Sequence, residues 1–205
     1  MKKVVIVAFL TVIAFNFSSC KSEAKKETSK EVSKVDAKFS LKKAKNEINF
    51  TAFKTTEKVP VGGQFKKVDI ISGGEGNTIK EAINNTEFSI PVSSIFTKDT
   101  SRDFKIKKFF FGIMDNTKLL SGKLVIENDS VGYTNIKMNG VTEKIPFQYT
   151  IENNSFSLKA TMDVTKWNAA DALAALNKEC FDLHKGADGI SKTWNEVLLN
   201  ITSTF

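Results

Sequence analysis

Apolar and polar residues alternate in short runs from Asn46 to the end of the chain. This period of two is expected of β-strands that bury one face and expose the other. The clearest run extends from Phe156 to Val164, and a further strand is expected from Gln64 to Ser72. Comparable runs contain Ile48, Phe88, Leu120, Thr134, Ile145 and Val197. The pattern predicts a mainly β domain of about eight strands.

Short polar segments separate several of these runs and predict antiparallel hairpins. They are Glu127–Ser130, Asn139-Gly140 and Glu152–Asn154. Asn139-Gly140 is the strongest of these signals, because both residue types tolerate a positive φ. Strands with one apolar face must enclose that face, as a sandwich or as a closed barrel. Eight strands make a barrel wide enough for side chains or one small ligand, but periodicity alone leaves both architectures open.

Three segments interrupt the strand pattern. Thr78–Asn84 is predicted to be a short helix, with Thr78 and Glu81 at the positions of a capping box. The segment Asp99–Met114 is expected to be irregular and is rich in Phe.

A longer helix is predicted from Asn168 to His184, with Asn168 as its N-cap and Gly186 just after its end. One stripe of this helix is apolar and could cover one end of a barrel. The stripe consists of Leu173, Leu176, Cys180 and Leu183.

The first twenty residues have the layout of a secretory signal: Lys2 and Lys3, an apolar run, then small residues before Cys20. A cysteine in this position resembles the bacterial lipobox, where the thiol is acylated and the chain is cut before it. We therefore expect residues 1–19 to be a signal peptide and Cys20 to carry the lipid. An uncleaved anchor is disfavoured, because the apolar run is shorter than the roughly 20 residues that span a bilayer.

Residue 21 is Lys rather than Asp, which resembles the sorting pattern for the outer membrane. The expected location is the cell envelope, on the outer membrane and facing the periplasm. Residues 20–36, rich in Lys, Glu and Ser, are expected to be a flexible tether, because they cannot bury enough apolar surface to fold. Residues 37–205 are the expected domain.

The net charge of +7 lies entirely in the residues before Asn46. From Asn46 onward, nineteen basic residues cancel nineteen acidic ones, and Arg102 is the only arginine. A neutral domain lacks the basic face that phosphate backbones require, so a nucleic-acid partner is not expected.

Five segments resemble a known family in their order along the chain. They are Val61-Gly62-Gly63-Gln64-Phe65, Ser93-Ser94-Ile95-Phe96-Thr97 with Arg102-Asp103-Phe104, Phe109-Phe110, Gly140-Val141-Thr142-Glu143-Lys144 and Trp194-Asn195-Glu196-Val197. Together they resemble the YceI-like family of lipocalin-like, polyisoprenoid-binding proteins, over about residues 36–205. The chain lacks the family's usual His in the first strand.

The resemblance implies an eight-stranded antiparallel barrel with one or two helical insertions and an apolar lumen. The implied ligand is an isoprenoid quinone, a polyprenyl chain or a fatty chain. The sequence itself makes Arg102 the candidate contact for its headgroup at the barrel mouth; the alternative is an ion pair of Arg102 with Asp103 that pins the loop. No other cofactor is expected. The residues expected to line the lumen are Phe50, Phe65, Phe88, Ile90, Phe109, Phe110, Leu124, Phe147, Tyr149, Leu158 and Met162.

The sequence leaves two other functions to consider. A barrel filled by its own Phe side chains would be a ligand-free interaction module in the envelope. An enzyme would have to use Cys180 and His184, which are four residues apart on the predicted helix. Two such residues do not make a metal site, and a Cys on an apolar stripe behaves as a small hydrophobe. We therefore expect no catalytic residues, no metal and no enzymatic activity.

Overall fold

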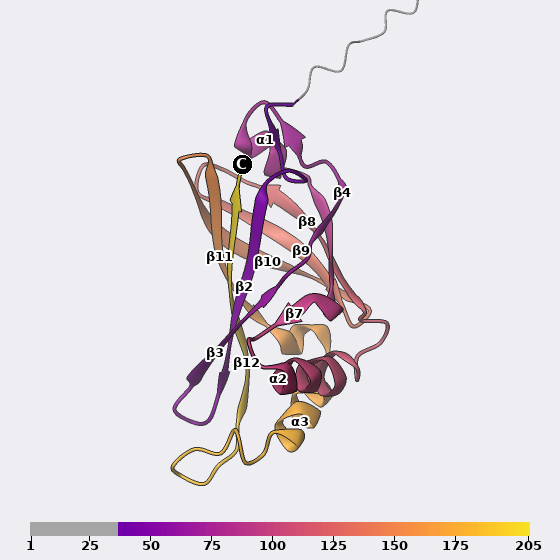
Figure 1. Ribbon diagram of the computed structural model, residues 1–205, viewed down its shortest axis with the longest axis vertical. Helices are drawn as coiled ribbons and strands as arrows, with labels where there is room; N and C mark the ends of the chain where they lie inside the picture. The colour runs from indigo at the N-terminus through magenta and orange to yellow at the C-terminus, as the bar shows by residue number, and fades with distance from the viewer. Residues whose placement is uncertain (1–36) are drawn as a thin grey trace, which may run out of the picture. The chain divides into compact units, whose positions relative to one another are not determined.

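The alternating runs form antiparallel strands that pair into one curled sheet of ten strands (Figure 1). The computed structural model describes residues 37–205. In hydrogen-bonded order the strands are β4 (Asp69–Ser72), β6 (Glu87–Pro91), β8 (Leu119–Ile126), β9 (Val131–Met138), β10 (Val141–Glu152), β11 (Ser155–Asp163), β12 (Thr193–Thr204), β2 (Lys45–Lys54), β3 (Val59–Phe65) and β7 (Ile95–Phe96). A separate two-stranded sheet pairs β1 (Phe39–Ser40) with β5 (Glu75–Gly76). The predicted mainly β, antiparallel fold is confirmed.

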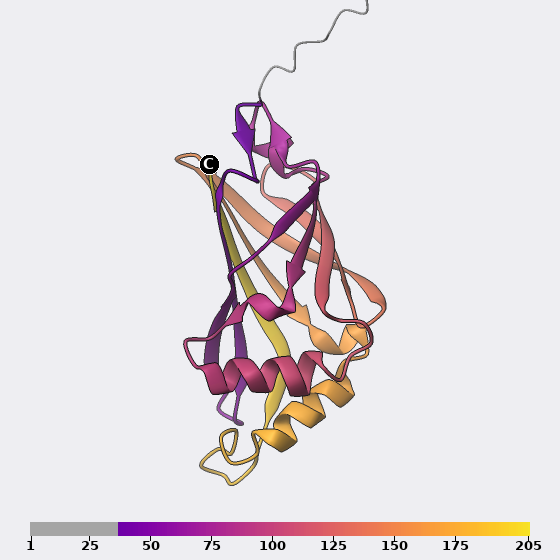
Figure 2. The same ribbon diagram turned by 45° about the vertical axis from the view of Figure 1, so that its right-hand side comes forward.

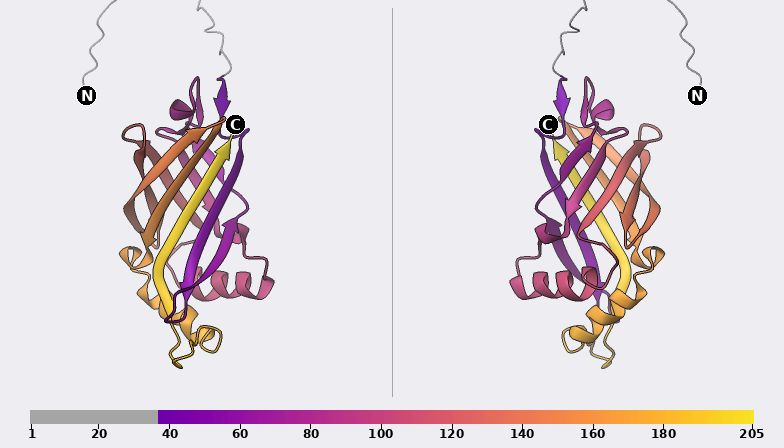
Figure 3. Two further views of the ribbon diagram at one scale, coloured as in Figure 1. Left: turned by 90° about the vertical axis from the view of Figure 1, so that its left-hand side faces the viewer. Right: turned by 90° about the vertical axis from the view of Figure 1, so that its right-hand side faces the viewer.

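The curl of the sheet follows from the connection between β3 and β4. β3 pairs with β2, β4 pairs with β6, and only residues 66–68 separate β3 from β4 along the chain. β4 forms one edge of the sheet, and β3 lies next to β7 at the other edge. The short connection between β3 and β4 therefore brings the two edges together, and the sheet curls around an interior, which we call the lumen. Figure 3 shows β2 and β12 side by side along one side of the sheet.

The predicted count of eight strands was wrong. The run from Gln64 to Ser72, expected as one strand, is divided between β3 and β4. In addition, Ile95–Phe96 forms the short strand β7, which pairs with the end of β3. Both differences arise where the chain bends and begins to pair with another strand. The alternation of apolar and polar residues does not reveal such bends.

The predicted hairpins are confirmed. Asn139 and Gly140 join β9 to β10 with φ values of 50° and 72°, as a turn with two left-handed positions requires. Asn153 and Asn154 join β10 to β11 with φ values of 47° and 61°. The segment Glu127–Ser130 joins β8 to β9.

Helix α1 (Ile79–Ile83) lies at the end of the sheet where the C-terminus is found (Figure 1). Its capping box is confirmed: the Thr78 hydroxyl accepts from the Glu81 amide at 3.2 Å, and the Glu81 carboxylate accepts from the Thr78 amide at 3.3 Å. These bonds satisfy backbone donors that a helix start leaves without partners.

Two further helices lie across the opposite end of the sheet (Figure 2). The segment expected to be irregular is instead helix α2 (Thr100–Lys105), which continues into the π-helical turn η2 (Ile106–Phe111). The Asp99 carboxylate caps α2 by accepting from the Arg102 amide at 3.0 Å. Asp is a residue type that commonly caps helices, so Asp99 could have indicated this helix in spite of the Phe-rich composition of the segment.

The helix predicted from Asn168 to His184 is shorter, because α3 spans Ala170–Glu179. Asn168 does not cap it. With φ of 55°, Asn168 instead ends the 3-10 helix η3 (Val164–Trp167). With α1, α2 and α3, the described chain has more than the one or two helical insertions expected, and a second 3-10 helix, η1 (Val92–Ser94), precedes β7.

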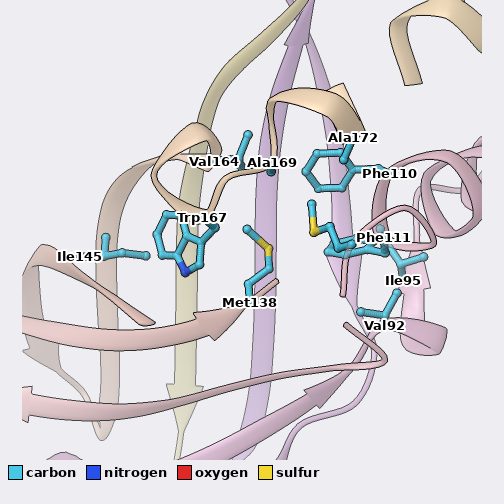
Figure 4. Packing of buried hydrophobic residues seen from close by; sticks show 11 residues of the cluster. Val92, Ile95, Phe110, Phe111, Met138, Ile145, Val164, Trp167, Ala169 and Ala172 are labelled. Carbon is cyan, nitrogen blue, oxygen red and sulfur yellow. The ribbon is translucent and has the colours of Figure 1, made fainter. Parts of the chain in front are cut away.

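The helices are held by a cluster of buried side chains at their end of the lumen (Figure 4). Trp167 is 1% exposed, and its indole N–H donates to the Ile136 carbonyl at 2.9 Å. Phe110, Phe111 and Met138 belong to the same cluster. All three buried clusters lie in the compact unit Asp36–Phe205, so we expect this unit to fold on its own.

Candidate functional site

The lumen contains an apolar cavity of about 210 Å³. Nine of the ten strands of the sheet contribute to its wall, and β10 does not. The helices close one end of the cavity with Ile106, Phe110, Phe111, Leu173 and Leu176. An apolar cavity of about 150 Å³ stays dry and binds benzene in another protein, so this volume accommodates a segment of a slender hydrocarbon chain.

The wall of the cavity has four polar side chains other than Trp194, and none of its residues within the described chain is charged. Ser203 donates to the Asn46 side-chain oxygen at 2.6 Å, and Thr193 donates to the Asn177 side-chain oxygen at 2.9 Å. The fourth polar residue is Thr134. A wall without charge cannot compensate the desolvation of an ionic group, so the cavity suits a neutral, apolar occupant.

Two Phe side chains of the cavity wall, Phe50 and Phe88, lie against glycines of neighbouring strands, which leaves the space beside them open. Phe147, outside the cavity, lies against a glycine in the same way. The three cross-strand pairs are Phe50–Gly63, Phe88–Gly122 and Phe147–Gly132. A Cβ atom at the glycine would come within 2.2 Å, 2.7 Å and 2.7 Å of the ring, respectively. Because the glycine has no side chain, each ring lies close to the backbone of the neighbouring strand.

Aromatic rings gather where the helices close the lumen. The ring centroids of Phe50 and Phe65 are 5.6 Å apart, and those of Phe65 and Phe111 are 6.4 Å apart. Phe110 packs edge-to-face against Phe111 at 5.0 Å, which is a favourable geometry for aromatic pairs. The Phe side chains therefore close one end of the lumen and also cover part of its wall.

Comparison with protein families gives a match to the YceI-like domain over residues 24–205. The chain belongs to the YceI-like family. No curated protein sequence matches it.

Solved structures with this YceI-like fold include a polyisoprenoid-binding domain from Saccharophagus degradans. It has 11% sequence identity and a TM-score of 0.56, and the match covers 77% of this chain and 91% of that domain. BcnA of Burkholderia cenocepacia has 13% identity and a TM-score of 0.51, with 80% of this chain and 98% of BcnA covered. At such low identity the likeness shows the shared fold.

Most of the residues expected to line the lumen of this YceI-like domain lie on the cavity wall. They are Phe50, Phe65, Phe88, Ile90, Phe110, Leu124, Leu158 and Met162. Phe109 does not line the cavity; its ring packs at 6.5 Å from that of Phe104. The π-helical turn places both Phe110 and Phe111 on the cavity wall, whereas the segment was expected to be irregular and Phe111 was not expected in the lumen.

Phe147 and Tyr149, also expected in the lumen, do not line the cavity. Both are buried on β10 and pack with Phe156, at centroid distances of 6.4 Å and 5.2 Å. The Tyr149 hydroxyl donates to the Asn128 carbonyl at 2.6 Å. These rings fill the space beneath β10, so this strand faces its own aromatic cluster and not the cavity.

Several wall residues were not among those expected to line the lumen, although the alternation places them on the same faces of the strands. They include Ile48, Ile136, Val197, Leu199 and Ile201. The polar wall residues Asn46, Thr134, Thr193 and Ser203 were not among the expected lumen residues either, and Thr134 lies in a weaker alternating run. From the apolar stripe of the helix, Leu173 and Leu176 reach the cavity, Cys180 is buried and Leu183 is 59% exposed.

Arg102 does not line the cavity. Its guanidinium lies 3.6 Å from the Asp99 carboxylate and 3.5 Å from the Thr97 carbonyl oxygen. The neighbouring Asp103 is buried and accepts from the Thr97 amide at 2.8 Å and from the Thr97 hydroxyl at 2.7 Å. In this structure Arg102 and Asp103 hold the start of α2 against the end of β7. A contact between Arg102 and the headgroup of the ligand stays a prediction.

Cys180 and His184 adjoin the end of α3. Burial raises the pKa of the Cys180 thiol, so the thiolate required of a nucleophile is disfavoured. Burial, with nearby Lys54 and Lys105, lowers the pKa of His184 to about 4. Because the Thr193 hydroxyl donates to Asn177, it accepts from His184 Nδ1–H at 2.6 Å. Within residues 37–205 no group of three or more His, Cys, Asp or Glu side chains could hold a metal ion.

The predicted signal peptide, the acylated Cys20 and the tether lie outside the described residues. In the part of the chain that the structure describes, no helix is long and apolar enough to cross a membrane.

Proposed function

We propose that this protein is an envelope lipoprotein whose lumen binds one long apolar lipid, for carriage or storage. Cys20 would attach it to the outer membrane, facing the periplasm. The ligand class is an isoprenoid quinone, a polyprenyl chain or a fatty chain. One observation carries the proposal: nine strands and four helical segments surround an apolar, uncharged cavity in a chain rich in Phe.

The energetics of the cavity favour a hydrocarbon chain. Apolar surface that leaves water contributes about 25 cal/mol per Å², and no charged group on the wall has to be desolvated. The solved domain from Saccharophagus degradans, which is described as polyisoprenoid-binding, shares the fold and supports this ligand class. The proposal requires no bond to be made or broken, and we propose no enzymatic role.

The alternative is a ligand-free interaction module. It requires a lumen filled by the protein's own side chains. The cavity weighs against it, as do the glycines that allow Phe50 and Phe88 to lie close to the wall.

The proposal is tested by mass spectrometry of organic extracts from residues 21–205, purified from bacterial cells without detergent. The expected result is a stoichiometric neutral lipid. A matched pair of variants controls for lipid that adheres to the surface: Ala160→Phe adds a ring inside the cavity, and Thr161→Phe adds one on the exposed face of the same strand. Thermal unfolding confirms that both variants fold.

Loss of lipid in Ala160→Phe, with retention in Thr161→Phe, is expected. Extracts from the wild-type domain that contain no lipid, together with failure to bind added isoprenoid or fatty chains, would overturn the proposal.

A further inference from the structure

One polar group in the cavity wall has no partner. The Thr134 side chain is 5% exposed and lines the cavity, and its hydroxyl makes no hydrogen bond. Thr134 lies in the middle of β9, opposite Leu124 on β8 and Ile145 on β10. Both cross-strand neighbours are apolar, so neither offers a hydrogen-bonding side chain.

Buried hydroxyl groups are normally paired, and each exception calls for a specific explanation. The other polar side chains of the wall illustrate the rule. Ser203 and Asn46 bond to each other, Asn46 also donates to the Leu41 carbonyl at 2.8 Å, and Thr193 bonds to Asn177. Among the polar wall residues Asn46, Thr134, Thr193 and Ser203, only the Thr134 hydroxyl stands unpaired.

A bound water molecule is a poor partner for this hydroxyl. Buried waters are held by two to four hydrogen bonds to polar groups. The wall around Thr134 offers a single side-chain group with free bonding capacity, and its neighbours Ile136 and Leu124 are apolar. A water molecule here would therefore lose most of the bonds that it makes in solution.

We infer that Thr134 binds a neutral oxygen atom of the ligand, so that a carbonyl or hydroxyl group of the lipid lies midway along the lumen. This inference rests on the proposed function and narrows it: the preferred ligand is an oxygenated lipid and not a pure hydrocarbon. A hydroxyl side chain donates to a carbonyl oxygen, and it both donates to and accepts from a hydroxyl group. The uncharged wall limits the group to a neutral one.

The test compares two probes that differ by one oxygen: farnesol and the hydrocarbon that lacks its hydroxyl group. Binding is measured for residues 21–205 by displacement of a fluorescent fatty-chain probe. The wild-type protein is expected to bind farnesol about tenfold more tightly than the hydrocarbon, the discrimination that one hydrogen bond typically supplies.

Thr134→Val removes the hydroxyl and nearly preserves the shape of the side chain. It is expected to abolish the preference for farnesol, to leave hydrocarbon binding intact, and to unfold at the same or a higher temperature. Thr134→Ala removes the same hydroxyl and should give the same loss of preference, which guards against a folding defect in one variant. Thr134→Ser should keep the preference. Ile136→Val, on the next inward position of β9, should change the binding of both probes equally.

Each outcome decides the inference. Loss of the farnesol preference in Thr134→Val and its retention in Thr134→Ser support it. Binding of both probes with an unchanged ratio in Thr134→Val overturns it and leaves the proposed function in place. If the wild-type protein binds neither probe, the inference falls together with the proposed function.

Discussion

The ring of Phe50 lies over Gly63, its cross-strand neighbour, so closely that a Cβ atom at residue 63 would come within 2.2 Å of the ring. Phe50 lines the cavity, and Gly63 is covered by it. The free volume of the lumen at this level therefore depends on the absence of a side chain at residue 63.

Gly63→Ala is expected to push the Phe50 ring into the cavity. Because the ring can move into free space, the free energy of unfolding should fall by no more than about 1 kcal/mol, below the usual cost of overpacking a filled core. The ring then competes with the lipid, and the dissociation constant should rise about tenfold. Titration with a fluorescent fatty-chain probe measures the change.

Gly62→Ala is the matched control for this variant. A Cβ atom at Gly62 would meet only the Phe50 carbonyl oxygen, at 4.0 Å. Its affinity should equal that of the wild-type protein. Equal affinities in Gly62→Ala and Gly63→Ala would show that the glycine does not keep the lumen open.

Trp167→Phe is expected to lower the free energy of unfolding by about 2–3 kcal/mol. The substitution leaves a cavity in the core and removes the hydrogen bond from the indole N–H to the Ile136 carbonyl. Trp194 offers a comparison, because its indole donates to the Thr55 carbonyl at 2.7 Å from a less buried position. Urea denaturation should show a smaller loss for Trp194→Phe, and the reverse order would contradict the packing described here.

Asp103→Ala is expected to cost about 1–3 kcal/mol, because the buried Thr97 amide and hydroxyl both lose their acceptor. Asp103→Asn keeps one side-chain oxygen and should cost less. Hydrogen exchange followed by mass spectrometry should show faster exchange in residues 95–105 of Asp103→Ala. Protection equal to that of the wild-type protein would mean that Asp103 does not hold α2 against β7.

His184 makes the stability of the domain depend on pH. In the unfolded chain the imidazole has an ordinary pKa near 6.5, whereas burial lowers it to about 4 in the folded protein. Between these values the unfolded state binds more protons, so stability falls as the pH drops through this window. His184→Gln should lose less stability than the wild-type protein between pH 7 and pH 4, as measured by urea denaturation at each pH. Parallel curves for the two proteins would contradict the buried, neutral state of His184.

Local sequence rules predicted much of this fold. Alternation located the strands, Asn139-Gly140 marked a hairpin, and Thr78 with Glu81 marked the start of a helix. Each of these signals depends on residues that are close in sequence. For that reason they could be recognised without knowing how distant parts of the chain pair.

The wrong predictions concern residues whose positions depend on contacts with parts of the chain that are distant in sequence. Phe147 alternates like any lumen residue, but its ring lies over Gly132 and packs against Phe156, which only the strand register reveals. Phe110 and Phe111 face the lumen together because the segment forms the π-helical turn η2 and is not irregular, as was expected. The unpaired state of the Thr134 hydroxyl likewise appears only when both neighbouring strands are in place.

The central claim is that the lumen holds a lipid chain, and a crystal structure of residues 21–205 purified without detergent tests it most directly. The account predicts continuous, elongated electron density between Ile48, Leu124 and Leu158, with Phe50 and Phe88 against the wall. A lumen without such density, occupied by the protein's own side chains, would contradict it.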